Sequence, residues 1–222
     1  MQTKPIQFYS KAQAAEVTGG CSQTTKMPCL SYELPTEACV TGSKLAKVEG
    51  SICSTCYANK GNYARYAKTI KPAQFKRLES LNNPDWVPAM IKLIGSSTHF
   101  RWHSSGDIQN LGHLEKIAAI AEALPDTLFW LPTREYAIVK AFITKHGKLP
   151  QNLTVRLSAL FVDQPVKIPA SLAKVSGIVV SNVHAKAAAV GIECAAPKQN
   201  GECRECRACW DPSIAAVSYH VH

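Results

Sequence analysis

The stretch HFRWHSSGDIQNLGHLEKIAAIAEALPDTLFWL, residues 99–131, sets out the pattern from which the fold is inferred. Its two ends, HFRWH at 99–103 and TLFWL at 127–131, have the aromatic and β-branched content of short strands. Between them apolar residues recur at helical spacing from Leu114 to Leu124, which predicts a helix over 113–124. Pro125 and Asp126 then provide a stop and a turn. The stretch is therefore typical of a βαβ unit.

The same alternation continues on the carboxyl side of this unit. A second helical run covers 135–146, and further β-rich runs lie at 154–162, 177–181 and 216–220. Strands that alternate with helices of this length indicate an α/β fold built of parallel βα units. An open sheet and an incomplete TIM-barrel-like sheet both fit, and we expect the barrel-like form, with cysteine-rich loops at both chain ends.

Length and composition fit one domain over residues 1–222. The chain is 46% hydrophobic and 18% charged, enough to bury a substantial core, so a disordered chain is excluded. We divide it into a cysteine-rich basic entry segment (1–81), a βα core (82–190) and a C-terminal cysteine cluster with the last strand (191–222). No apolar run is long enough to span a bilayer, and the first residues lack the apolar core of a signal peptide.

Polar residues follow several predicted strands, at the edge of the sheet where α/β proteins place their reactive groups. As helix caps and turns they would be purely structural. Together they predict a pocket for a small charged cofactor or substrate, bound by Ser105, Gly106, Asp107, Arg134, Arg156 and Ser181, with Arg101 also in the lining. His103 closes a strand at this edge, as a ligand, a proton carrier or a structural histidine.

Nine cysteines, an odd number in a chain without an export signal, favour metal binding over disulfides. The first motif is Cys39-x13-Cys53-x2-Cys56. A CxxC turn plus one earlier thiolate gives three ligands to one site, which in a 4Fe-4S cluster leaves one iron open. Cys29 is close enough in sequence to close the site, which would then be a saturated cluster or a zinc site.

The second motif is Cys194-x8-Cys203-x2-Cys206-x2-Cys209. Successive spacings of three suit a 4Fe-4S cubane, whose iron atoms are separate, better than one zinc ion that draws all its sulfurs into a tetrahedron. Zinc is the alternative. These seven cysteines are the expected metal ligands, in one centre or two, and Cys21 is expected to be a buried or spare thiol.

The positive charge of the chain, formally +9, favours anionic partners. Residues 57–77 contain six bases and no acid, interleaved with aromatic side chains. They form either a solvated helix face or a surface for nucleic acid or phosphate, with Lys60, Arg65, Lys68, Lys71, Lys76 and Arg77 as the contacts. P-loop, GxGxxG and HExxH motifs are absent, so ATP hydrolysis, hydride transfer and zinc proteolysis have no support.

Several longer motifs resemble the phage gene product 88 family, whose members are uncharacterised. They are MPCLSYELP (27–35), ICSTCYANKGNY (52–63), FRWHSSGDIQN (100–110), LFWLPTREY (128–136), VRLSA (155–159) and CRECRACW (203–210). The resemblance covers most of the chain. It implies a viral protein in the cytoplasm of an infected bacterial host, and it implies no particular reaction.

More loosely, Cys39, Cys53 and Cys56 are similar to the cluster loop of radical S-adenosylmethionine enzymes, with a spacing of thirteen and two residues in place of three and two. SSGD stands where those enzymes carry a glycine-rich loop for the amino group of the cofactor. One hypothesis is therefore an iron–sulfur enzyme that uses S-adenosylmethionine on a small or nucleic-acid substrate, supplied with electrons by a host reductant. The other is a non-catalytic nucleic-acid-binding or redox-sensing module stapled by a cluster or by zinc.

Overall fold

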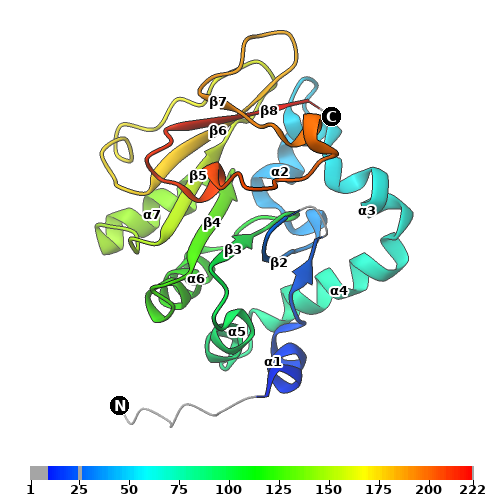
Figure 1. Cartoon of the computed structure of the whole chain (residues 1–222), viewed down its shortest axis with the longest axis vertical. Helices are drawn as coiled ribbons and strands as arrows, with labels where there is room; N and C mark the ends of the chain where they lie inside the picture. Colours follow the sequence, from blue (N-terminus) through cyan, green and yellow to red (C-terminus); the bar gives the residue numbers. More distant parts are fainter. Residues whose placement is uncertain (1–9, 25–26, 222) are drawn as a thin grey trace.

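The computed structural model describes residues 10–24 and 27–221 and shows one eight-stranded sheet with helices packed against it (Figure 1). The strand order is β1-β2-β3-β4-β5-β6-β8-β7. The bounds are β1 (Ser22–Gln23), β2 (Leu30–Tyr32), β3 (His99–Trp102), β4 (Leu128–Thr133), β5 (Leu153–Ser158), β6 (Ile178–His184), β7 (Ile192–Glu193) and β8 (Ala216–His220).

All neighbouring strands pair in parallel except β1 and β2, which are antiparallel. From β2 to β6 each strand lies beside its predecessor in the sequence. Because parallel crossovers are right-handed, this order places successive helices on the same face of the sheet, as in a barrel. The α/β class and its parallel βα units are confirmed, and the sheet is open.

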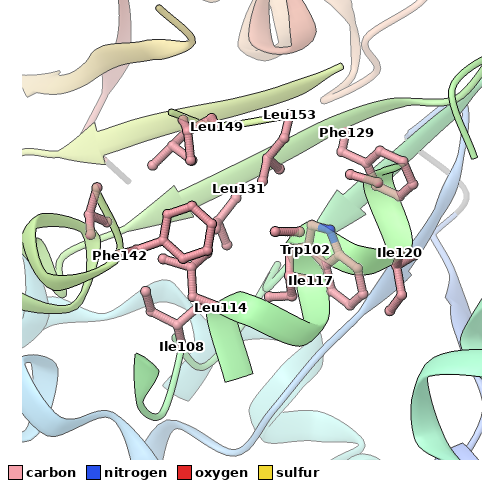
Figure 2. Packing of buried hydrophobic residues seen from close by; sticks show 14 of the residues in the cluster. Trp102, Ile108, Leu114, Ile117, Ile120, Phe129, Leu131, Phe142, Leu149 and Leu153 are labelled. Atoms are coloured by element: carbon pink, nitrogen blue, oxygen red, sulfur yellow. The ribbon is translucent and has the colours of Figure 1, made fainter. Parts of the chain in front are cut away.

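The helices are α1 (Lys11–Thr18), α2 (Val40–Leu45), α3 (Gly61–Arg65), α4 (Ala67–Ser80), α5 (Trp86–Ile94), α6 (Leu111–Ala123) and α7 (Tyr136–His146). In Figure 1, α5, α6 and α7 lie next to one another along one side of the strands. Figure 2 shows the core they form: Leu114, Ile117 and Ile120 of α6 face Phe129 and Leu131 of β4. Burial of these side chains is the main source of stability for the sheet.

The opposite face of the strands is covered by a C-terminal segment, residues 208–214. Trp210, in a 3₁₀ turn (Ala208–Trp210), is buried beside Trp130 of β4 and donates its Nε1–H to the carbonyl of Phe100 at 2.9 Å. Arg156 of β5 has no exposed surface and donates five hydrogen bonds to backbone carbonyls, those of Val180, Ala208, Cys209, Asp211 and Ile214. Four of these acceptors belong to this segment and the fifth, Val180, to β6, so every N–H of the guanidinium is bonded to backbone and none is left for the cofactor predicted from the sequence.

Most predicted elements lie where the sequence placed them. The helices predicted at 113–124 and 135–146 are α6 and α7, and the strand at 216–220 is β8. The run predicted at 154–162 differs, since β5 ends at Ser158. Its last residues leave the sheet and pair with the cysteine loop: Ser51 and Phe161 form an antiparallel bridge, and the N–H of Ile52 donates to the carbonyl of Leu160 at 3.0 Å.

The three regions distinguished in the sequence contribute to one sheet. β1 and β2 come from residues 1–81, β3 to β6 from 82–190, and β7 and β8 from 191–222. Within the described ranges, no helix is both long and apolar enough to cross a bilayer. Residues 1–9, on which the expectation of no signal peptide falls, lie outside the described part.

Candidate functional site

A cavity of about 1020 Å³ opens at the carboxyl ends of the parallel strands. Its wall includes residues at or just after the ends of β2, β3, β4, β5, β6 and β8, so the reactive edge lies where parallel α/β folds place it. A volume of this size accommodates a cofactor-sized molecule. Of the predicted pocket residues, Arg101, Ser105, Gly106, Asp107, Arg134 and Ser181 line it, and Arg156 does not.

Cys39, Cys53 and Cys56 all line this cavity, and Cys39 and Cys53 lie next to Gly42 of α2. A β-carbon at residue 42 would lie 3.6 Å from the sulfur of Cys39 and 3.7 Å from that of Cys53. Burial raises the pKa of both thiols, and the guanidinium of Arg134 opposes the rise in each case. The glycine therefore leaves the space into which two of the three thiols project.

Two long-range contacts shape the loop that carries these cysteines. The carboxylate of Glu135, at the start of α7, accepts hydrogen bonds of 2.7 Å from the backbone N–H and the hydroxyl of Thr41, two residues after Cys39. The bridge between Ser51 and Phe161 fixes the chain just before Cys53. Sequence reasoning missed Glu135, because its role depends on a contact between residues that lie 94 positions apart.

The SSGD loop packs tightly against the chain that follows β2. Gly106 has a φ of 76°, and a β-carbon there would lie 2.7 Å from the carbonyl oxygen of Leu34, so this position requires glycine. The hydroxyl of Ser105 donates to the same carbonyl at 3.0 Å and accepts from Gln74 at 2.8 Å. The loop is therefore held rigidly at the cavity wall, with Ser105 and Gly106 in structural roles as well.

Asp107 and Arg134 lie together in the wall. Asp107 accepts hydrogen bonds from the hydroxyl of Thr133 at 2.6 Å and from the backbone N–H of Arg134 at 2.8 Å. Burial raises the pKa of its carboxyl to about 6. The Nε–H of Arg134 donates to the carbonyl of Ala159 at 3.0 Å, which fixes the guanidinium. A carboxyl group and a cation thus face one cavity, the pair that recognises an amino acid moiety.

His103 is buried in the cavity wall at the end of β3, with a φ of 54°. Neither ring nitrogen has a hydrogen-bond partner, and burial lowers the pKa well below its ordinary value, so the imidazole is neutral. Positive φ in a non-glycine residue costs free energy and is concentrated at functional sites. These features favour a role in ligand contact over that of a satisfied structural histidine.

The four C-terminal cysteines lie outside the cavity wall, and Cys29 lies with them. Cys29 packs against Trp130 and Trp210, next to Cys209, and Cys203 and Arg101 are among its electrostatic neighbours. It is therefore not placed to complete the set of Cys39, Cys53 and Cys56. Cys21 packs against the main core near Arg77 and Glu33, apart from both groups.

Residues 7–212 match the family model described as Gene product 88. The chain belongs to the gene product 88 family. No curated protein and no solved structure matches it. In this member of the family, both cysteine groups and the SSGD loop lie within the matched range.

In the described part of this gene product 88 chain, no three His, Cys, Asp or Glu side chains converge closely enough to enclose a single metal ion. The cysteine sulfurs are thus not drawn into one tetrahedron. Metal binding by either group stays a prediction.

The basic segment of this family member forms helices α3 and α4. Arg77 is buried, donates to Glu33 at 3.1 Å and lies over the ring of Tyr32, so it is a core ion pair and no part of a basic surface. Lys71 pairs with Glu37. The other four bases, Lys60, Arg65, Lys68 and Lys76, are exposed. These four make no salt bridge in the described part of the chain, and their exposure fits both a solvated helix face and a surface for an anionic partner.

Proposed function

We propose that this protein is an iron–sulfur enzyme in which Cys39, Cys53 and Cys56 bind a 4Fe-4S cluster with one open iron facing the cavity. We further propose that the cavity binds S-adenosylmethionine at that iron. One observation carries the proposal: these three cysteines line the cavity, whereas Cys29, the nearest further thiol in sequence, packs elsewhere. Three ligands and an adjoining cavity are what an open iron requires.

The residues present fit a cluster. Thiolates are the ligands that iron–sulfur clusters take, and a cubane spreads them over separate iron atoms, so they need not converge on one point. Gly42 leaves room between two of the sulfurs. Burial raises the pKa of Cys39 and Cys53 and the guanidinium of Arg134 lowers it, so metal binding would displace the thiol protons, with Arg134 offsetting part of the thiolate charge.

The polar wall fits the methionine part of S-adenosylmethionine. Asp107 accepts hydrogen bonds from its ammonium group, and Arg134 pairs with its carboxylate. Ser105 and Gly106 are fixed by Leu34, and Asp107 by Thr133, so the wall is arranged before the ligand arrives. His103, neutral and unpartnered, remains for the other end of the ligand or for the substrate.

When bound, the cluster and S-adenosylmethionine would supply a one-electron reductive cleavage of the sulfonium, with a low-potential one-electron donor of the host as the source of the electron. The chain's own part would be to hold the cluster through Cys39, Cys53 and Cys56 and to orient the ligand through Asp107 and Arg134.

Anaerobically reconstituted, dithionite-reduced full chain tests the proposal. We expect S-adenosylmethionine to change the paramagnetic resonance spectrum and to be converted slowly to 5′-deoxyadenosine. Cys56→Ala should abolish both effects, and Cys21→Ala, whose thiol lies in the core, should leave both unchanged. An unchanged spectrum with no 5′-deoxyadenosine from the iron-loaded protein, or zinc in place of iron and sulfide, overturns it.

A second candidate function, nucleic-acid binding, is favoured by the exposed face of α3 and α4. Its four free bases are accompanied by the exposed rings of Tyr66 and Phe75, which can stack on bases. Lys60→Gln, Lys68→Gln and Lys76→Gln combined should weaken single-stranded nucleic-acid binding and reduce its dependence on salt. Lys140→Gln, Lys145→Gln and Lys148→Gln combined, at exposed positions on and just after α7, remove the same number of charges and serve as the control. Equal binding by both variants would contradict this candidate.

A further inference from the structure

We propose that Cys194, Cys203, Cys206 and Cys209 hold a second iron–sulfur cluster, separate from the cavity and from the set of Cys39, Cys53 and Cys56. The C-terminal cluster goes beyond the proposed enzyme function and does not require its reactivity. The count of two clusters rests on the N-terminal cluster proposed there.

The backbone brings the four C-terminal cysteines together. The N–H of Cys194 donates to the carbonyl of Ser218 at 2.8 Å, beside β8, and the sulfur of Cys209 contacts the hydroxyl of Tyr219, one residue along the same strand, at 3.1 Å. Cys203 and Cys206 are joined by a turn, with an N–H to carbonyl distance of 2.9 Å. Cys194 and Cys209 therefore lie beside adjacent residues of β8, and Cys203 and Cys206 share one turn.

Electrostatics connect the same residues. Burial raises the pKa of Cys203, and Cys194 and Cys206 lie near enough to raise it further; burial likewise raises the pKa of Cys209, with a smaller contribution from Cys194. For Cys39 the cysteine neighbours are Cys53 and Cys56. Within the described chain, none of the main contributions to the pKa of a cysteine in one group comes from a cysteine of the other group.

Arg101 is an independent sign of a missing negative charge. It comes from β3, stacks over the ring of Trp130 at 4.3 Å, and has Cys29, Cys203 and Cys209 around it. The half-buried guanidinium donates to the sulfur of Met27 at 3.0 Å and to the hydroxyl of Tyr57 at 3.4 Å, whereas its Nε is enclosed without a hydrogen-bond partner, and no carboxylate within the described ranges pairs with it. A partly buried cation without a counter-charge is costly. A thiolate-bound cluster, which is net negative, would supply that charge.

Arg156 provides the scaffold for the set. Its bonds to the carbonyls of Ala208, Cys209 and Asp211 fix the end of the CxxCxxC run on the sheet without using any thiol. Four cysteines saturate one cluster, so Cys29 is left as a buried neighbour in contact with Trp130 and Trp210. The second cluster therefore has no open iron, in contrast to the first.

Metal analysis of the full chain, prepared anaerobically, tests the proposal. We expect about eight iron and eight sulfide per chain, and about four of each in both the double variant Cys203→Ala/Cys206→Ala and the double variant Cys53→Ala/Cys56→Ala. Cys21→Ala and Cys29→Ala should keep the full content. Circular dichroism confirms folding, and Cys206→Ala, which removes an exposed thiol, serves if the first double variant does not fold.

The outcomes separate the possibilities. Loss of all iron in both double variants means one shared centre and overturns the proposal. About four iron in the wild type, unaffected by Cys203→Ala/Cys206→Ala, means the C-terminal thiols are not ligands. One zinc per chain that is lost in Cys203→Ala/Cys206→Ala would show that the four C-terminal thiols form a zinc site and not a cluster. Failure of S-adenosylmethionine cleavage with eight iron present affects only the proposed function.

Discussion

Glu135 holds Thr41 through both carboxylate oxygens, one bonded to the backbone N–H and the other to the hydroxyl, each at 2.7 Å. The contact joins the first residues of α7 to the first turn of α2. Because Cys39 immediately precedes α2, the position of its thiol depends on a carboxylate 96 residues further along the chain.

Replacing Glu135 by Ala should therefore lower iron retention at the first cysteine group. The substitution leaves the N–H of Thr41 without its acceptor, and we expect a loss of about 1–3 kcal/mol in the free energy of unfolding. Iron per chain and denaturant unfolding are the measurements. Glu122→Ala on α6, an exposed position, is the control, and equal iron in the two variants would show that the contact does not shape the site.

Gly42→Ala should lower metal binding without lowering the stability of α2. In a helix, alanine is more stable than glycine by roughly 1 kcal/mol, so substitution alone should not destabilise α2. The added methyl group would meet the β-carbon of Cys39 at 2.9 Å and must displace the thiols. We expect folded protein with reduced iron content. Lys44→Ala, in the same helix and exposed, should retain its iron, and so should Gly42→Ala if the thiols do not meet there.

Arg156→Lys should loosen the C-terminal segment. Lysine has three donors on one nitrogen and cannot reproduce a planar fork bonded to five carbonyls. Hydrogen exchange should rise several-fold over residues 206–214 while α6 stays protected. Arg204→Lys, with an exposed side chain, should change nothing. Unaltered exchange in Arg156→Lys would mean that Trp210 alone anchors the segment.

The pKa of Asp107 predicts a pH dependence in the metal-free protein. Burial raises it to about 6, above the roughly 3.9 of an unfolded aspartate, so the folded chain binds the proton more tightly. The contribution of Asp107 to stability is thus present below pH 4 and is lost as the pH rises to about 6, by about 3 kcal/mol. Urea unfolding from pH 4 to pH 7 should show this slope in the wild type relative to Asp107→Asn. The same pH dependence of the unfolding free energy in the wild type and in Asp107→Asn would contradict this prediction.

The central βαβ pattern was predictable because its periodicity is strong and its helices have capping or stop signals. β2 was not, since Leu30–Tyr32 is only three residues long and gains its place from pairing with β3. The end of β5 was misplaced for a related reason: Leu160 and Phe161 have strand-like side chains, but their partner is the cysteine loop and not the sheet.

The cavity lining was predictable where residue type and position at a strand end coincide, as for Asp107 and Arg134. Cys39, Cys53 and Cys56 were singled out by their spacing instead. Arg156 shows the limit of that reasoning. Alternation along a strand places it on the inner face, yet only the fold reveals that five backbone carbonyls occupy its donors. The role of Gly42 could not be read from the sequence either. Its neighbour Cys53 is eleven residues away in the sequence, and only the folded loop places the two side by side.

The contacts that shape the first cysteine group have a consequence for the order of folding. The hydrogen bonds between Thr41 and Glu135 and between Ile52 and Leu160 each close a long loop of the chain. Closing such a loop costs conformational entropy, which other contacts must offset first. We expect β4 and β5 to pair before the thiols reach their final places. Cluster insertion then acts on a nearly folded chain, and the interval before it is when the uncoordinated cysteines are most open to oxidation.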